Sequence, residues 1–207
     1  MRSLYIDTSS SFLYSAIVND NKVEAEIKKE FGHSLSEVAL PEIVSMFEKN
    51  KLEAKDIDKI IVVNGPGSFT GIRIGVTIAK VYAWSLKTPV TTITSLDAMA
   101  VSSNANTYKV PMIDARRKYV FTAIYDKDNN VVLKPCYLKL EEINEKLKEL
   151  DKYTVITNDK LDYENRETYS PDFLKVVNAF KDKKAINPHA VNPDYLKLTE
   201  AEESKLK

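Results

Sequence analysis

The stretch from Gly65 to Gly75, GPGSFTGIRIG, holds four of the five glycines in this chain. Glycine permits positive φ angles and close backbone approach, whereas proline fixes φ and ends the element before it. The β-branched run at 60–63 is typical of a buried strand, and residues 70–86 have helical periodicity, with Ser68 or Thr70 available as the N-cap. The sequence therefore predicts a strand, a sharp turn and a long helix in direct succession.

Two interpretations of this turn stay open at the level of sequence. A glycine-rich turn before a helix can offer its amides to an anion, or its glycines can simply let the chain reverse and the helix pack closely. The glycines fall at 65, 67, 71 and 75, so neither the phosphate-loop pattern nor the dinucleotide pattern is matched. We favour the structural interpretation for the turn, whose residues are Gly65, Pro66, Gly67, Ser68 and Phe69.

The composition narrows the class of protein. The 207 residues include 30 Lys and Arg against 30 Asp and Glu, so no overall electric field favours nucleic acid or membrane. The single cysteine, Cys136, excludes an internal disulfide and favours a reducing compartment, by default the cytoplasm. Asp7 interrupts any signal-peptide pattern at the start, and no apolar run is long enough to span a membrane.

The order of predicted elements repeats along the chain. The first copy is predicted as a strand at 4–6, a hairpin at 12–18 and 23–27, a helix at 34–50, a strand at 60–63 and a helix at 70–86. After a bridging helix at 95–101, the second copy is predicted as strands at 110–113, 119–125 and 131–138, a helix at 141–150, a strand at 153–157 and a helix at 171–180. The helix ends are predicted from Ser34 with Glu37 as a capping box, Pro41 as a bend, and Ser170 as a cap.

This βββαβα unit, present twice, predicts a two-lobed α/β fold of the actin-like or ribonuclease-H-like (ASKHA) type. We expect an N-terminal lobe at 1–105 and a shortened C-terminal lobe at 106–207. Asp7 and Asp114 end the first strands of the two copies and should face each other across a cleft. The turn after Asp7 has no glycine, and Arg116 and Arg117 follow Asp114, so the nucleotide site of this fold class is expected to be degenerate. The two arginines are candidates for an anion contact, or else for surface ion pairs.

Several motifs of the sequence resemble those of a known family. The run GPGSFTGIRIG at 65–75 resembles the signature of the TsaB (YeaZ) family of tRNA threonylcarbamoyladenosine biosynthesis. Supporting matches are Ile6-Asp7-Thr8-Ser9, His33-Ser34, Leu40-Pro41, Ser95-Leu96-Asp97-Ala98, Asp114-Ala115-Arg116-Arg117 and Pro193-Asp194-Tyr195-Leu196. Lys197 departs from the arginine that the family usually has there, and the agreement is thin after about Ala123.

The resemblance implies a non-catalytic subunit with no cofactor. Family members dimerise with the catalytic paralogue TsaD through helices of the N-terminal lobe, the ATPase TsaE joins the pair, and tRNA is engaged through the complex. The resemblance also implies a homodimer when the chain is alone. The residues agree that no metal site is expected, because His33 has Glu37 four positions later where the paralogue has its second histidine, and His189 lies in a polar loop.

The two N-terminal helices have apolar residues on more than one face, which favours a partner on the second face. Small residues at 71, 75, 79 and 83 form a stripe that another helix could approach closely. Our hypothesis makes this stripe the pairing seam. The predicted interface comprises Leu35, Ala39, Ile43 and Met46 on the first helix and Gly71, Ile74, Gly75, Ile78, Ala79 and Tyr82 on the second.

Three alternatives come from other classes. An actin-like ATPase or kinase would use Asp7 and Asp114. A metallopeptidase or serine hydrolase would need a His-Glu-x-x-His or Gly-x-Ser-x-Gly pattern, and the chain has neither. A self-associating structural protein would use the same helices. Lysines 181, 183, 184, 205 and 207 near the C-terminus are expected to form a solvated charged tail rather than an RNA contact.

Overall fold

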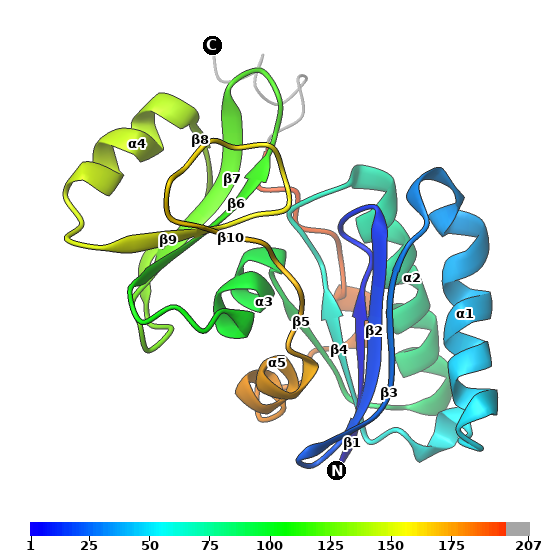
Figure 1. Ribbon diagram of the computed structural model, residues 1–207. Helices are drawn as coiled ribbons and strands as arrows, with labels where there is room; N and C mark the ends of the chain where they lie inside the picture. Colours follow the sequence, from blue (N-terminus) through cyan, green and yellow to red (C-terminus); the bar gives the residue numbers. More distant parts are fainter. Residues whose placement is uncertain (198–207) are drawn as a thin grey trace.

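The computed structural model describes residues 1–197 and contains two five-stranded sheets (Figure 1). The first sheet has the order β3-β2-β1-β4-β5, from β1 (Arg2–Asp7), β2 (Phe12–Asn19), β3 (Lys22–Glu30), β4 (Lys59–Val63) and β5 (Val90–Ile93). The second has the order β10-β9-β6-β7-β8, from β6 (Tyr108–Asp114), β7 (Tyr119–Tyr125), β8 (Val131–Lys139), β9 (Tyr153–Ile156) and β10 (Arg166–Glu167). In both sheets the first three strands are antiparallel and the last two join in parallel. The predicted two-lobed α/β fold with a repeated arrangement is confirmed.

The helices form an outer and an inner layer (Figure 1). Helices α1 (Leu35–Lys49) and α2 (Phe69–Leu86) cover the outer face of the first sheet, and α4 (Leu140–Lys148) lies on the outer side of the second. Helices α3 (Ser95–Ser102) and α5 (Phe173–Phe180) pack together between the sheets, where α3 contacts β6 and β7 and α5 contacts β1, β2 and β3. The last helix of each lobe therefore packs on the sheet of the other lobe.

The inner layer is one continuous core. Tyr5 of β1 lies with its ring 5.6 Å from that of Phe173 on α5, and Ala123 and Tyr125 of β7 belong to the same buried cluster. Because this cluster draws on both sheets, separating the lobes would expose it to water. The two lobes are thus joined by apolar packing as well as by the chain. Within the part of the chain that the structure describes, no helix is long and apolar enough to cross a membrane.

Several predicted helix ends agree with the structure and one is wrong. Ser68 caps α2 by accepting a hydrogen bond from the Gly71 amide, and Pro41 lies inside α1, both as predicted. The capping box of Ser34 with Glu37 does not form, because a 3₁₀ turn at Gly32–Ser34 precedes α1 and leaves Ser34 in a helical conformation (φ −81°, ψ −2°). An N-cap residue needs a non-helical backbone to aim its oxygen at the first amides.

The second lobe differs from the prediction after β9. The helix predicted at 171–180 is α5, which follows the additional strand β10 and is capped by Asp172 rather than Ser170. It therefore occupies the position of α3, not of α2. No helix joins β9 to β10, so α2 has no counterpart in the second lobe. Strands β5 and β10 were both missed from the sequence; each is short.

The C-terminal segment returns to the first lobe. Ile186 pairs with Val90 beside β5, Val191 is buried in the first core, and the Asp194 amide donates to the Asn64 carbonyl at 2.7 Å. The predicted lobe at 106–207 is therefore wrong for residues 186–195, which pack against the first lobe. Of the predicted lysine tail, Lys181, Lys183 and Lys184 directly precede this segment, whereas Lys205 and Lys207 lie outside the described residues.

The small-residue stripe of α2 faces the first sheet. A Cβ at Gly71 would lie 2.1 Å from the Thr8 carbonyl oxygen, and one at Gly75 would lie 2.5 Å from Thr8 Oγ1. Ala79 and Ala83 are fully buried in the same core. The hypothesis that this stripe is the pairing seam is therefore wrong: the glycines bring α2 close to the end of β1, not to a partner.

Candidate functional site

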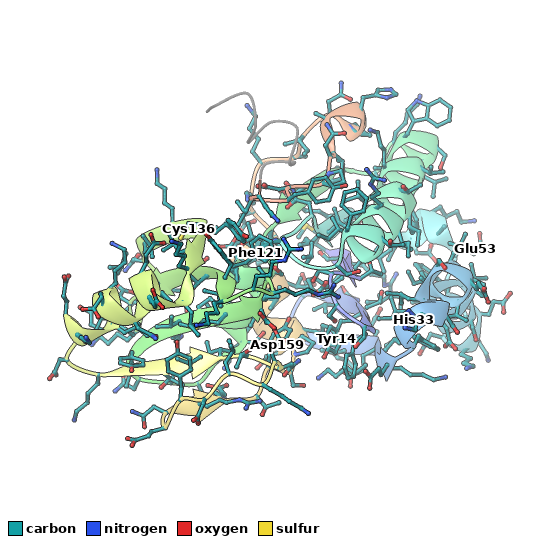
Figure 2. The ribbon with its side chains drawn as sticks, turned by 90° about the horizontal axis from the view of Figure 1, so that it is seen from above. Tyr14, His33, Glu53, Phe121, Cys136 and Asp159 are labelled. Atoms are coloured by element: carbon teal, nitrogen blue, oxygen red, sulfur yellow. The ribbon has the colours of Figure 1, made fainter. Side chains whose placement is uncertain are left out.

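A cleft of about 790 Å³ lies between the lobes. Asp7 at the end of β1 and Asp114 at the end of β6 both line it, as the repeat predicted, together with the first turn of α2 and Tyr169. Figure 2 shows Phe121 and Asp159 of the second lobe and Tyr14 of the first near the middle of the molecule, whereas His33 lies out on the first lobe. The structure thus brings the two predicted aspartates into one cavity.

Asp7 lines this cleft and is only 2% exposed. Its carboxylate accepts hydrogen bonds from the Ser9 amide at 2.8 Å and the Tyr5 hydroxyl at 3.3 Å. Burial raises the pKa of Asp7, and the hydrogen bonds to Ser9 and Tyr5 oppose this only in part. The same burial raises the pKa of Tyr5 and Tyr169. The carboxylate is therefore held by hydrogen bonds from the chain itself.

Asp7→Asn is expected to raise the melting temperature at neutral pH. Because the folded state holds the Asp7 proton more tightly than the unfolded chain does, stability falls as pH rises from the ordinary carboxyl pKa of 3.8 through the raised value. The variant escapes that loss, so its advantage in thermal unfolding should shrink as pH falls toward 3.8. The exposed Asp151→Asn is the control. A pH-independent difference, or a less stable Asp7→Asn at neutral pH, would contradict this account.

The glycine turn closes directly on the loop after β1. The Ser68 amide donates to the Ser9 carbonyl at 2.7 Å, and a Cβ at Gly67, where φ is +148°, would lie 2.2 Å from the same oxygen. Thr8 Oγ1 donates to the Gly71 carbonyl at 2.7 Å and accepts from the Gly75 amide at 3.0 Å. These contacts favour the structural interpretation of the turn, since the Ser68 amide is already paired with the Ser9 carbonyl and Gly67 is needed for the close approach of the two segments.

The turn after β6 forms the opposite wall. Asp114 Oδ1 accepts from the Arg116 amide at 2.8 Å, and the Asp114 amide donates to Asp159 at 2.7 Å. Arg116, Arg117 and Lys118 all have positive φ, at 65°, 53° and 63°, and their side chains are exposed. No ion pair to either arginine forms within residues 1–197. Surface ion pairing, one of the two predicted roles, is thus not seen in this part of the chain.

The predicted interface residues mostly lie inside the first lobe. The buried ones are Leu35, Ala39, Ile43, Met46, Gly71, Gly75 and Ala79, and the partly buried ones are Ile74, Ile78 and Tyr82. The apolar side chains that α1 and α2 expose away from their ends are different: Leu40 (53%), Val44 (46%), Val81 (58%) and Trp84 (63%), besides Phe69 and Leu86 at the two ends of α2. We call Leu40, Val44, Val81 and Trp84 the outer helix face. Apolar residues on two faces of each helix indicated that one face meets a partner, but the sequence did not show which of the two faces points outward.

Sequence reasoning also missed a cluster where α2 begins. The Arg73 guanidinium lies 3.9 Å from the Phe69 ring centroid, Phe69 stacks on Tyr195 at 4.8 Å, and Arg73 Nε donates to the Tyr195 hydroxyl at 2.8 Å. A Cβ at Gly65, where φ is +130°, would lie 2.0 Å from the Asp194 carbonyl oxygen. The glycine turn is therefore also the surface on which the C-terminal segment packs, with Gly65 against the Asp194 carbonyl. Among residues 1–197, no three His, Cys, Asp or Glu side chains are grouped to hold a metal ion.

The repeated sheet order and the cleft between the lobes define a two-lobed α/β protein with one five-stranded sheet in each lobe. The structure of YeaZ from Pseudomonas aeruginosa has the same fold, with a TM-score of 0.80 at 17% identity over 94% of this chain and 99% of that one. The sequence is 31% identical to the tRNA threonylcarbamoyladenosine biosynthesis protein TsaB of Bacillus subtilis (strain 168), over 98% of this chain and 96% of the relative. It is 31% identical to TsaB of Escherichia coli (strain K12) over 72% and 68%.

A model of the family TsaD, tRNA N6-adenosine threonylcarbamoyltransferase, matches residues 23–202. The chain belongs to the TsaB (YeaZ) family, within the wider group that this model describes. The resemblance read from the glycine run is thereby confirmed.

Proposed function

We propose that this chain is the non-catalytic pairing subunit of a complex that synthesises threonylcarbamoyladenosine in tRNA. Its partner is a TsaD-like threonylcarbamoyltransferase, a TsaE-like ATPase joins the pair, and the complex acts in the cytoplasm. Membership of the TsaB family supports the pathway. The match to the TsaD model supports a partner of related sequence.

The observation that carries the pairing role is the outer helix face. Val81 and Trp84 of α2 and Leu40 and Val44 of α1 are about half exposed or more, and they lie on helices that cover the same side of the first sheet. Exposed apolar side chains gathered on one side mark a protein interface more often than scattered ones do. Aromatic anchors such as Trp84 are typical of the energetic centre of such interfaces.

This outer helix face replaces the buried stripe in the proposal. In each helix the exposed and buried residues alternate with helical spacing, so one face holds the core and the other is free. A partner helix pair would cover the free face without disturbing the fold. A chain without its partner is expected to cover the same face with a second copy, so homodimer and heterodimer compete.

The cleft supports the non-catalytic part of the proposal. An ATPase with this fold needs a carboxylate that can reach a metal, and a first turn with room for phosphate. Asp7 is instead buried and bonded to Ser9 and Tyr5, and the glycine turn closes on the Ser9 carbonyl. Tight Mg–ATP binding by the isolated chain in calorimetry would favour the ATPase alternative that uses Asp7 and Asp114.

The experiment that tests the role is a reconstitution with each protein omitted in turn. The chain, a TsaD-like transferase and a TsaE-like ATPase from the same cell are mixed with tRNA and the substrates, and threonylcarbamoyladenosine is measured by mass spectrometry. We expect modification to be lost when this chain is left out. Normal modification without it would overturn the proposed function.

A further inference from the structure

The turn between β6 and β7 presents three consecutive cations, Arg116, Arg117 and Lys118. It lies at the upper end of the second sheet in Figure 1, and the Lys118 carbonyl accepts from the Leu140 amide, which ties it to the start of α4. All three residues have positive φ and exposed side chains. Non-glycine residues in this region cost energy, and such costs concentrate where a loop has a role. The left-handed backbone conformation here places three positively charged side chains on one turn.

A stacked pair of tyrosines, Tyr119 and Tyr137, lies directly beside this turn. Tyr119 and Tyr137 are stacked with ring centroids 4.7 Å apart and an interplanar angle of 11°, and Phe121 lies 5.4 Å from Tyr137. Tyr119 and Tyr137 are both partly exposed. Two further cations border the rings: Lys139 is paired with Tyr119 across the sheet, and Lys197 Nζ lies 5.6 Å from the Tyr137 centroid. The surface thus combines flat rings with flanking positive charge.

Three carboxylates in the described part of the chain lie near this surface, but they accept hydrogen bonds from backbone amides instead of pairing with its cations. Asp114 accepts from the Arg116 amide, Asp159 accepts from the Asp114 amide, and Glu142 accepts from the Lys139 amide. None of the three forms an ion pair with the five cations within residues 1–197. The chain as a whole has zero net charge, so this excess of positive charge is local. We call Arg116, Arg117, Lys118, Tyr119, Tyr137, Lys139 and Lys197 the basic–aromatic surface.

We propose that the basic–aromatic surface binds RNA directly. The cations contact phosphates, and the stacked pair of Tyr119 and Tyr137 packs against an unpaired base. Arginine and lysine neutralise phosphates, and stacking on aromatic rings is how proteins hold single-stranded bases. An acidic protein would use the cations but has no need of the two partly exposed tyrosines beside them. The proposal goes beyond the pairing role, which engages tRNA only through the complex. It rests on the proposed function only in naming tRNA as the RNA.

Fluorescence anisotropy of labelled tRNA with the purified full-length chain, over a series of salt concentrations, tests this. We expect binding that weakens with salt, and an Arg117→Glu and Lys118→Glu double variant that binds about tenfold or more weakly with a salt slope reduced by about two. Tyr137→Leu should weaken binding about fivefold or more, with its salt slope unchanged, through lost stacking. Lys51→Glu is the matched control, because Lys51 is also an exposed lysine with positive φ (56°), but in the first lobe.

Three outcomes would overturn the RNA contact: no tRNA binding by the wild-type chain, equal losses for the double variant and Lys51→Glu, or unchanged tRNA binding by the double variant. Circular dichroism of each variant separates misfolding from lost binding. The assay uses no partner protein, so its failure leaves the omission experiment standing, and failure of that experiment leaves this one standing.

Discussion

Gly71→Ala is expected to lower the free energy of unfolding by about 3 kcal/mol or more. The added methyl group would lie 2.1 Å from the Thr8 carbonyl oxygen, which is a backbone atom and cannot swing aside. To make room, α2 would have to leave β1, and the hydrogen bonds of Thr8 Oγ1 to Gly71 and Gly75 would then be lost. Chemical denaturation monitored by circular dichroism measures the loss.

The matched control for this prediction is Gly32→Ala. Gly32 has a positive φ of 53°, but a Cβ there would meet nothing within 4 Å, so the variant pays only backbone strain of about 1 kcal/mol. A Gly71→Ala loss no larger than that of Gly32→Ala would mean that α2 can shift without cost. The close approach of α2 to the end of β1 would then not be what the glycine requires.

Val81→Glu is expected to weaken binding of the TsaD-like transferase about 100-fold while leaving thermal stability unchanged. Val81 is 58% exposed, so a carboxylate there stays hydrated in the free chain, but an apolar partner would have to bury it unpaired. Co-purification of the two proteins and the yield of modified tRNA in the reconstituted system measure the effect. Modified tRNA should fall together with binding.

The control for Val81→Glu is Val131→Glu. Val131 is 52% exposed on β8 of the second lobe, so it tests the same chemical change away from the outer helix face. We expect Val131→Glu to bind the transferase like the wild-type chain. Equal losses for the two variants would mean that added negative charge, rather than the position of Val81, prevents pairing.

The sequence could predict the fold because local signals agreed with the overall pattern. The β-branched run at 60–63 and the Ser68 cap of α2 depend on near neighbours, and both are found in the structure. The position of Asp7 and Asp114 after the first strands of two similar units was enough to bring them to one cleft. Strands β5 and β10 were missed because they are short, and β10 has no apolar run; the sequence between Pro89 and Thr94 could have indicated the first.

The orientation of α2 could not be read from the sequence. A stripe of small residues predicts close approach, but the period of 3.6 does not say whether the neighbour is the chain itself or a partner. Here the neighbour is the chain itself, because Thr8 forms hydrogen bonds with Gly71 and Gly75, which are 63 and 67 residues away. The hydrogen bond from Arg73 to Tyr195 joins residues that are 122 positions apart in the chain. Such pairs leave no local pattern, so only the structure could supply them.

The most direct test of the pairing role is a calorimetric titration of a TsaD-like transferase with this chain. We expect the wild-type chain and Val131→Glu to bind with the same affinity and Val81→Glu to bind about 100-fold more weakly. Wild-type affinity for folded Val81→Glu would contradict the pairing role.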